Sequence, residues 1–141
     1  MRLVKAALAS GLLVAAAFGC GGSRVALAPM SATYTISPAA RVDLTNIQDD
    51  IYTLMVYNTS GGGLVIDRDA FLLQTPAGLI KREPGGLASV YNVPPGGAHD
   101  VRLRFRVEGL PAGQQVYLLV DQAVRVNGEP VGLPPIVLQA H

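Results

Sequence analysis

Apolar and polar residues alternate without interruption over residues 101–107. Successive side chains of an extended strand point to opposite faces, so this stretch predicts a strand with one buried and one solvated face. The positions expected to face the core hold Val101, Leu103, Phe105 and Val107. The outward positions hold a row of three arginines spaced about 6.6 Å apart, namely Arg102, Arg104 and Arg106.

Short apolar segments recur from residue 32 onward, and none has a helical period. Glycine and proline, 16 and 10 residues in the whole chain, separate these segments and favour turns. Asn127-Gly128 is a particularly strong tight-turn signal. The pattern therefore predicts an all-β antiparallel sandwich or barrel. The expected strands cover 32–36, 41–44, 51–58, 64–66 with 70–74, 78–81, 87–92, 101–107, 115–125 and 136–139.

Two of these strands have a predicted facing. Residues 51–58 are apolar nearly throughout, with Tyr52, Leu54 and Val56 expected on one side and Met55 and Tyr57 on the other. Residues 116–120 are continuously apolar, which is typical of a central strand covered on both faces.

The first twenty residues have the layout of an export signal. Arg2 and Lys5 form a basic start, an apolar run follows up to Phe18, and Gly19-Cys20 closes it. The run is shorter than the roughly 20 residues of a membrane-spanning helix. We therefore expect residues 1–19 to be a cleaved signal helix, residues 20–31 a flexible tether, and residues 32–141 one domain. Removing the first 19 of 141 residues leaves 122, which is enough for a single core.

The residues around the cleavage position, Ala17-Phe18-Gly19-Cys20, resemble the lipobox of bacterial lipoproteins. In that family the cysteine thiol receives a diacylglycerol, the signal is cut before it, and the new amine is acylated. The resemblance implies palmitate-type acyl chains on Cys20 and a membrane anchor. Gly21 follows the cysteine where aspartate would retain a Gram-negative lipoprotein in the inner membrane, so we expect the periplasmic face of the outer membrane. The alternative is ordinary cleavage after Ala15-Ala16-Ala17, which would leave Cys20 as a free thiol.

Residues 42–138 resemble the immunoglobulin-like β-sandwich domains of exported bacterial proteins. The resemblance lies in an apolar strand ending at Asn58-Thr59-Ser60, a strand after Asp67-Arg68-Asp69, and Val93-Pro94-Pro95-Gly96-Gly97 before the alternating strand. It implies an immunoglobulin-like antiparallel sandwich, in which Tyr117 could form a tyrosine corner. Antibody hallmarks are absent, because the chain has no tryptophan and one cysteine.

Composition excludes several function classes. Losing Arg2 and Lys5 lowers the basic residues from 11 to 9 against 10 acidic ones, so the mature chain carries about −1 and has no general attraction to nucleic acid. A single cysteine permits neither an internal disulfide nor a cysteine-based metal site. His99 and His141 are the only histidines and have no second ligand at metal-binding spacing. We expect no metal and no cofactor.

Two groups of charged residues are candidate sites. The arginine row at Arg102, Arg104 and Arg106 could hold a phosphate, a lipid or an acidic glycan. The alternative, which we favour, is a solvated face whose charges pair with acids on neighbouring strands. Asp67 and Asp69, with Asp49 and Asp50 upstream, could ligate calcium, but turn and capping roles fit their spacing better.

Two hypotheses for function follow. The first is a non-enzymatic binding or structural module, anchored in the envelope by its lipid and contacting another envelope protein, a glycan or a lipid. The second is a small enzyme or ligand carrier with a site assembled from loops, for which Asp49, Asp67, His99 and Asp100 are the available groups. We favour the first, because neither a nucleophile motif nor a phosphate-binding loop occurs in the sequence.

Overall fold

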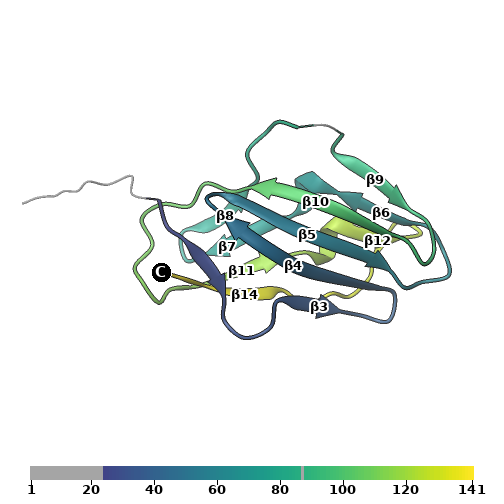
Figure 1. The fold of residues 1–141 in the computed structure, drawn as a ribbon, viewed down its shortest axis with the longest axis horizontal. Helices are drawn as coiled ribbons and strands as arrows, with labels where there is room; N and C mark the ends of the chain where they lie inside the picture. Colours follow the sequence, from purple (N-terminus) through teal and green to yellow (C-terminus); the bar gives the residue numbers. More distant parts are fainter. Residues whose placement is uncertain (1–23, 87) are drawn as a thin grey trace, which may run out of the picture.

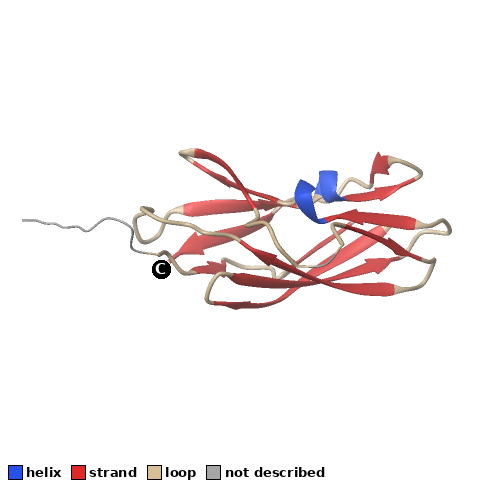
Figure 2. Ribbon diagram, turned by 90° about the horizontal axis from the view of Figure 1, so that it is seen from above, coloured by secondary structure: helices blue, strands red, loops and turns tan. Residues whose placement is uncertain are grey.

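The computed structural model describes residues 24–86 and 88–141. Gly19, Cys20 and the predicted signal over residues 1–19 lie outside these residues. The described chain is all-β, and its antiparallel sheets pack in two layers as a sandwich (Figures 1 and 2). The predicted all-β antiparallel sandwich is therefore confirmed. No helix among the described residues is long and apolar enough to cross a membrane.

The first layer is one four-stranded sheet with the order β10-β5-β4-β3. A tight turn at Asp49, with a φ of 57°, joins the two longest strands. Aspartate tolerates this left-handed conformation better than most residues. Within the sheet β10 pairs only with β5, so it is an edge strand. The bounds are β3 (Tyr34–Ile36), β4 (Ala40–Gln48), β5 (Ile51–Asn58) and β10 (Ala98–Arg104).

The second layer consists of two sheets, ordered β2-β14-β11-β7-β8 and β13-β12-β6-β9. The chain passes between them through two 3-10 turns, η1 (Arg68–Ala70) from β6 to β7 and η2 (Asp121–Ala123) from β11 to β12. The strands are β2 (Leu27–Pro29), β6 (Leu64–Asp67), β7 (Leu72–Thr75), β8 (Gly78–Lys81), β9 (Val90–Val93), β11 (Gln115–Leu119), β12 (Val124–Val126), β13 (Glu129–Pro130) and β14 (Ile136–Ala140). The predicted turn at Asn127-Gly128 joins β12 to β13, with φ values of 54° and 79°.

The continuous strand predicted over residues 115–125 is wrong. The turn η2 interrupts it, and the chain leaves one sheet for the other at this point. Asp121 stabilises the interruption, because its Oδ1 accepts hydrogen bonds from the backbone N–H groups of Gly132 and Leu133, at 2.7 and 2.9 Å. Both partners are ten or more residues away, so the local apolar pattern cannot signal the break.

The tyrosine corner suggested for Tyr117 does not form either. Its hydroxyl donates to the side-chain oxygen of Gln115, two residues earlier on the same strand, at 3.1 Å. A tyrosine corner requires a bond to the backbone instead.

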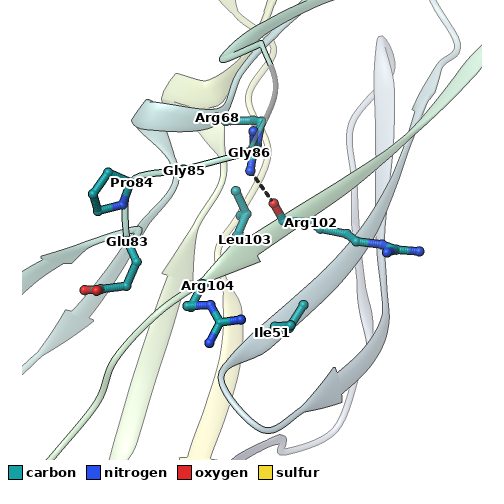
Figure 3. A pocket seen from close by; sticks show the side chains of 9 residues that line it. All are labelled: Ile51, Arg68, Glu83, Pro84, Gly85, Gly86, Arg102, Leu103 and Arg104. Atoms are coloured by element: carbon teal, nitrogen blue, oxygen red, sulfur yellow. Dashed lines mark hydrogen bonds between the residues drawn. The ribbon is translucent and has the colours of Figure 1, made fainter.

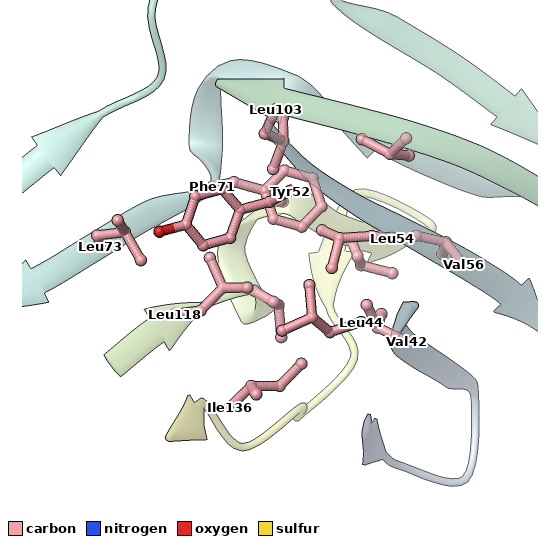
Figure 4. Packing of buried hydrophobic residues seen from close by; sticks show 14 of the residues in the cluster. Val42, Leu44, Tyr52, Leu54, Val56, Phe71, Leu73, Leu103, Leu118 and Ile136 are labelled. Atoms are coloured by element: carbon pink, nitrogen blue, oxygen red, sulfur yellow. The ribbon is translucent and has the colours of Figure 1, made fainter. Parts of the chain in front are cut away.

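The core lies between the two layers and is formed by both (Figure 4). Tyr52 and Leu54 of β5 and Leu103 of β10 meet Phe71 and Leu118 of the second layer there. The expected facing of β5 is confirmed, because Tyr52, Leu54 and Val56 are buried while Tyr57 on the opposite side is exposed.

The alternation predicted for residues 101–107 is also confirmed. Val101, Leu103, Phe105 and Val107 are each at most 2% exposed. The strand itself ends at Arg104, three residues earlier than predicted. The segment beyond it keeps its facing because the Phe105 N–H donates to the Asp50 carbonyl, and the Val107 carbonyl accepts from the Val25 N–H.

The tether predicted over residues 20–31 is wrong for its described part. Strand β2 pairs with β14, Leu27 is 4% exposed, and Arg24 forms a β-bridge with Glu108. The guanidinium of Arg24 also pairs with the buried carboxylate of Asp50. This segment is short and apolar between Arg24 and Ser31, with no alternating pattern, so its strand depends on pairing with β14. The folded domain therefore includes residues 24–31.

Burial raises the pKa of the Tyr52 phenol, and the nearby charge of Asp50 adds to the shift. Because the folded-state pKa lies above the unfolded value of about 10, the unfolded chain ionises first, and stability is lost progressively as the pH rises from about 10 toward the folded-state pKa. We expect the wild type to lose more stability between about pH 9 and pH 11 than the Tyr52→Phe variant, as measured by urea unfolding. Identical pH profiles for the two proteins would contradict the burial of this phenol.

Candidate anion-binding site

The arginine row lies at the open edge of the first layer. Arg102 and Arg104 are exposed on β10, and Arg106 follows the end of the strand. Across the sheet, Arg102 is opposite Thr53 and Arg104 is opposite Ile51. Neither of these cross-strand partners is acidic, and the acid on the same face of β10 is Asp100, two residues before Arg102.

Three ion pairs occur among the described residues, and none involves the row. They are Arg24 with Asp50, Arg41 with Asp43, and Arg82 with Asp69. The solvated face that we favoured for the arginines is therefore present, but the expected pairing with neighbouring acids is not.

A fourth arginine, Arg68, lies beside β10 and is not among the site residues predicted from the sequence. Its residue is only 9% exposed. Nη2 donates to the backbone carbonyl of Arg102 at 2.9 Å, and Nη1 donates to the carbonyl of Ala88 at 3.1 Å. The buried Nε has no hydrogen-bond partner. The sequence signal here, two aspartates flanking an arginine, drew attention to the carboxylates, whereas the burial of the arginine depends on the distant strand β10.

The loop after β8 closes over this guanidinium. A Cβ on Gly86 would lie 3.2 Å from Nη1 and 3.3 Å from Nη2 of Arg68, and the glycine has a φ of +84°. Both facts favour glycine at this position. Arg82 holds the same loop from the other side, donating to the carbonyls of Glu83 and Gly85 at 3.3 and 3.2 Å. The loop is also tied to β10, because the Glu83 N–H donates to the Arg104 carbonyl at 2.6 Å.

Between this loop and β10 lies an open pocket of about 210 Å³ (Figure 3). It contains three arginines, Arg68, Arg102 and Arg104, and one acid, Glu83. Figure 3 shows the Glu83 carboxylate directed away from Arg102 and Arg104. The remaining lining comes from Ile51, Pro84, Gly85, Gly86 and Leu103. The lining side chains therefore carry a net positive charge. On the loop side, Gly85 and Gly86 allow a ligand to come close to the backbone.

The acidic residues of the predicted loop site have structural roles. Asp67 caps η1, accepting from the Asp69 N–H at 3.0 Å, and Asp69 pairs with Arg82. Asp49 forms the β4–β5 turn, and Asp50 pairs with Arg24. The turn and capping roles expected for Asp49 and Asp67 are confirmed.

The groups considered for a loop-assembled enzyme are not brought together. Asp49 and Asp100 line different pockets, of about 400 and 250 Å³, which share Arg102, and the Asp100 pocket also includes Arg68 and Gly86. The His99 ring stacks on Tyr91, with centroids 4.2 Å apart. The backbone N–H of His141 donates to the Ala26 carbonyl. In residues 24–86 and 88–141, no group of three or more histidine, cysteine or acidic side chains could hold a metal ion.

No protein-family model and no curated protein matches this sequence. The fold is similar to that of a crystal structure described as a putative lipoprotein (ycdA) from Bacillus subtilis, with a TM-score of 0.56 and 17% sequence identity. The similarity covers 77% of this chain and 38% of the Bacillus chain, so the chain spans well under half the length of that protein. At this identity the likeness concerns the fold alone: the β-sandwich of this chain resembles part of the structure of a putative lipoprotein.

Proposed function

We propose that this chain is a bacterial envelope lipoprotein whose β-sandwich is a non-enzymatic binding module, anchored through a lipid on Cys20. The observation that carries the proposal is the position of the domain relative to that cysteine. Arg24 is already held in the fold by its bridge to Glu108, only four residues after Cys20. Four residues reach at most about 14 Å, so an anchor on Cys20 would keep this end of the sandwich at the membrane surface.

Two further observations support the proposal. The similar fold of the Bacillus structure belongs to a chain described as a putative lipoprotein. Of the groups considered for a loop-assembled site, Asp67 caps a turn, Asp50 and Asp69 form ion pairs, and the His99 ring stacks on Tyr91. Gly21 after the lipobox favours the periplasmic face of the outer membrane. There the module would contact an envelope protein, a glycan or a lipid.

Lipidation is tested by changing Cys20 to serine in the full-length chain. We expect the wild type to incorporate a labelled fatty acid and to sediment with membranes. The Cys20→Ser variant lacks the thiol nucleophile, so it should incorporate no label and either remain an uncleaved precursor or become soluble. The readouts are metabolic labelling and membrane fractionation.

Ser23→Ala is the matched control, since it alters a neighbouring small polar residue but keeps the thiol. It should behave as the wild type. Equal labelling of wild type and Cys20→Ser would show that the acyl chain is elsewhere or absent, and the proposed anchor would be abandoned.

A further inference from the structure

No described acidic group lies within ion-pair distance of the buried guanidinium of Arg68, and the candidate partner is Asp100, which lines an adjoining pocket together with Arg68 and Arg102. The two hydrogen bonds of the guanidinium go to neutral backbone carbonyls. Buried charges in proteins are normally paired or bound to a ligand, because an isolated ion loses its hydration without compensation. Arg82, the other buried arginine of this region, follows the rule through its ion pair with Asp69.

Two more unpaired cations line the same pocket. Arg102 and Arg104 are exposed and form no ion pair, so their side chains can reorient toward a ligand without breaking a salt bridge. The one lining acid, Glu83, turns its carboxylate away from them (Figure 3). The pocket thus concentrates positive charge on a domain whose total charge is close to neutral.

We propose that this pocket, between β10 and residues 83–86, binds a phosphate group. Arg68 supplies a fixed, largely desolvated charge at the base, and Arg104 donates from the open side. The guanidinium of Arg102 points away from Arg68 in Figure 3 and turns toward the ligand on binding. A phosphate offers oxygens in several directions and suits guanidinium groups that approach from different elements. Gly86 packs directly against the Arg68 guanidinium, where a Cβ would lie 3.2 Å from Nη1, and so helps to hold this charge in place.

The phosphate can be free or belong to a lipid headgroup. The second source is favoured by topology, because β10 ends beside the segment that pairs with residues 24 and 25 at the start of the domain. This preference rests on the proposed lipid anchor, whereas binding of free phosphate does not. Fatty-acid labelling therefore tests the lipid anchor, and the titration described next tests the phosphate site. Failure of one proposal does not imply failure of the other.

The test uses the full chain purified in neutral-detergent micelles. Thermal unfolding is followed while inorganic phosphate is added at constant ionic strength, with chloride as the reference anion. A parallel series replaces phosphate with phosphatidylglycerol doped into the micelles. We expect saturable stabilisation, since a ligand that binds only the native state raises the unfolding temperature by mass action. Stabilisation by inorganic phosphate would identify free phosphate as the ligand. Stabilisation seen only in the doped micelles would identify the lipid headgroup. Either result supports the proposal.

Variants locate the site. Arg104→Gln should weaken binding at least tenfold, the loss expected for one charge-assisted contact of about 1.4 kcal/mol, and adding Arg102→Gln should abolish saturation. The matched control is Arg106→Gln, which removes an equal charge from the same row but does not line the pocket, and it should change binding less than about twofold. Equal weakening by Arg106→Gln and Arg104→Gln would indicate diffuse attraction along the row. That result, or no stabilisation in either series, would overturn the proposal. Arg68 is left intact because its variants also lose the bonds to β10.

Discussion

Replacing Leu103 by alanine is expected to destabilise the domain by about 2–5 kcal/mol, a large share of the roughly 5–15 kcal/mol that a domain possesses. The side chain is 1% exposed and lies where β10 meets the second layer, near Tyr52 and Phe71 (Figure 4). Truncation removes buried methyl groups and leaves a cavity that two sheets, tied by their hydrogen bonds, cannot fill. Urea unfolding of the purified chain measures the loss.

The adjacent residue provides the control. Arg104 is exposed and forms no ion pair among the described residues, so Arg104→Ala should cost within about 1 kcal/mol. The two substituted residues are neighbours in the sequence, but their side chains lie on opposite faces of the strand. Equal destabilisation by both would mean that the stem of Arg104 supports the loop over residues 83–86 through packing.

Replacing Asn58 by aspartate is expected to cost about 3–5 kcal/mol, the range for leaving a buried charge uncompensated. Asn58 is 1% exposed at the end of β5, and its Nδ2 donates to the carbonyls of Gly62 and Val93, at 2.7 and 3.0 Å. Its Oδ1 accepts from the N–H and hydroxyl of Ser60. Aspartate preserves the shape and the bonds to Ser60, but it places an anionic oxygen against two carbonyls.

Asn92→Asp is the matched control for this substitution. Asn92 is exposed on β9, one residue from Val93, so the same chemical change there should stay within about 0.5 kcal/mol. The cost at Asn58 should shrink on acidification, since protonation removes the buried charge. A cost below about 1 kcal/mol at neutral pH would show that water replaces the lost hydrogen bonds.

Local sequence patterns were sufficient for the fold class. The strict alternation over residues 101–107 assigned every side chain there to the correct face, and the turn at Asn127-Gly128 lies where its chemistry predicts. Both signals arise from neighbouring residues, because the side-chain period of a strand and the φ preferences of turn residues operate over a few positions. Short connections then account for the antiparallel pairing of consecutive strands, such as β4 with β5 and β7 with β8, but not for pairs such as β10 with β5.

The same patterns were misleading where a distant partner decides the conformation. The strand expected over residues 115–125 is broken because Asp121 binds the backbone of Gly132 and Leu133. The segment over residues 24–31 looked like a tether, yet β2 forms on the open edge of β14. In both cases the deciding hydrogen bonds join residues that are far apart in the chain.

The candidate site also has one part that local patterns predict and one part that depends on distant residues. The sequence by itself determined that Arg102, Arg104 and Arg106 share one exposed face, since alternation alone requires it. Only the tertiary structure decided that two of them meet a pocket with Arg68 while Arg106 does not. Burial of Arg68 depends on a loop and an edge strand brought together from positions 18 and 34 residues further along the chain, at Gly86 and Arg102. Local periodicity reports the face on which a side chain lies, whereas its charge environment is set by whichever distant segments fold against it.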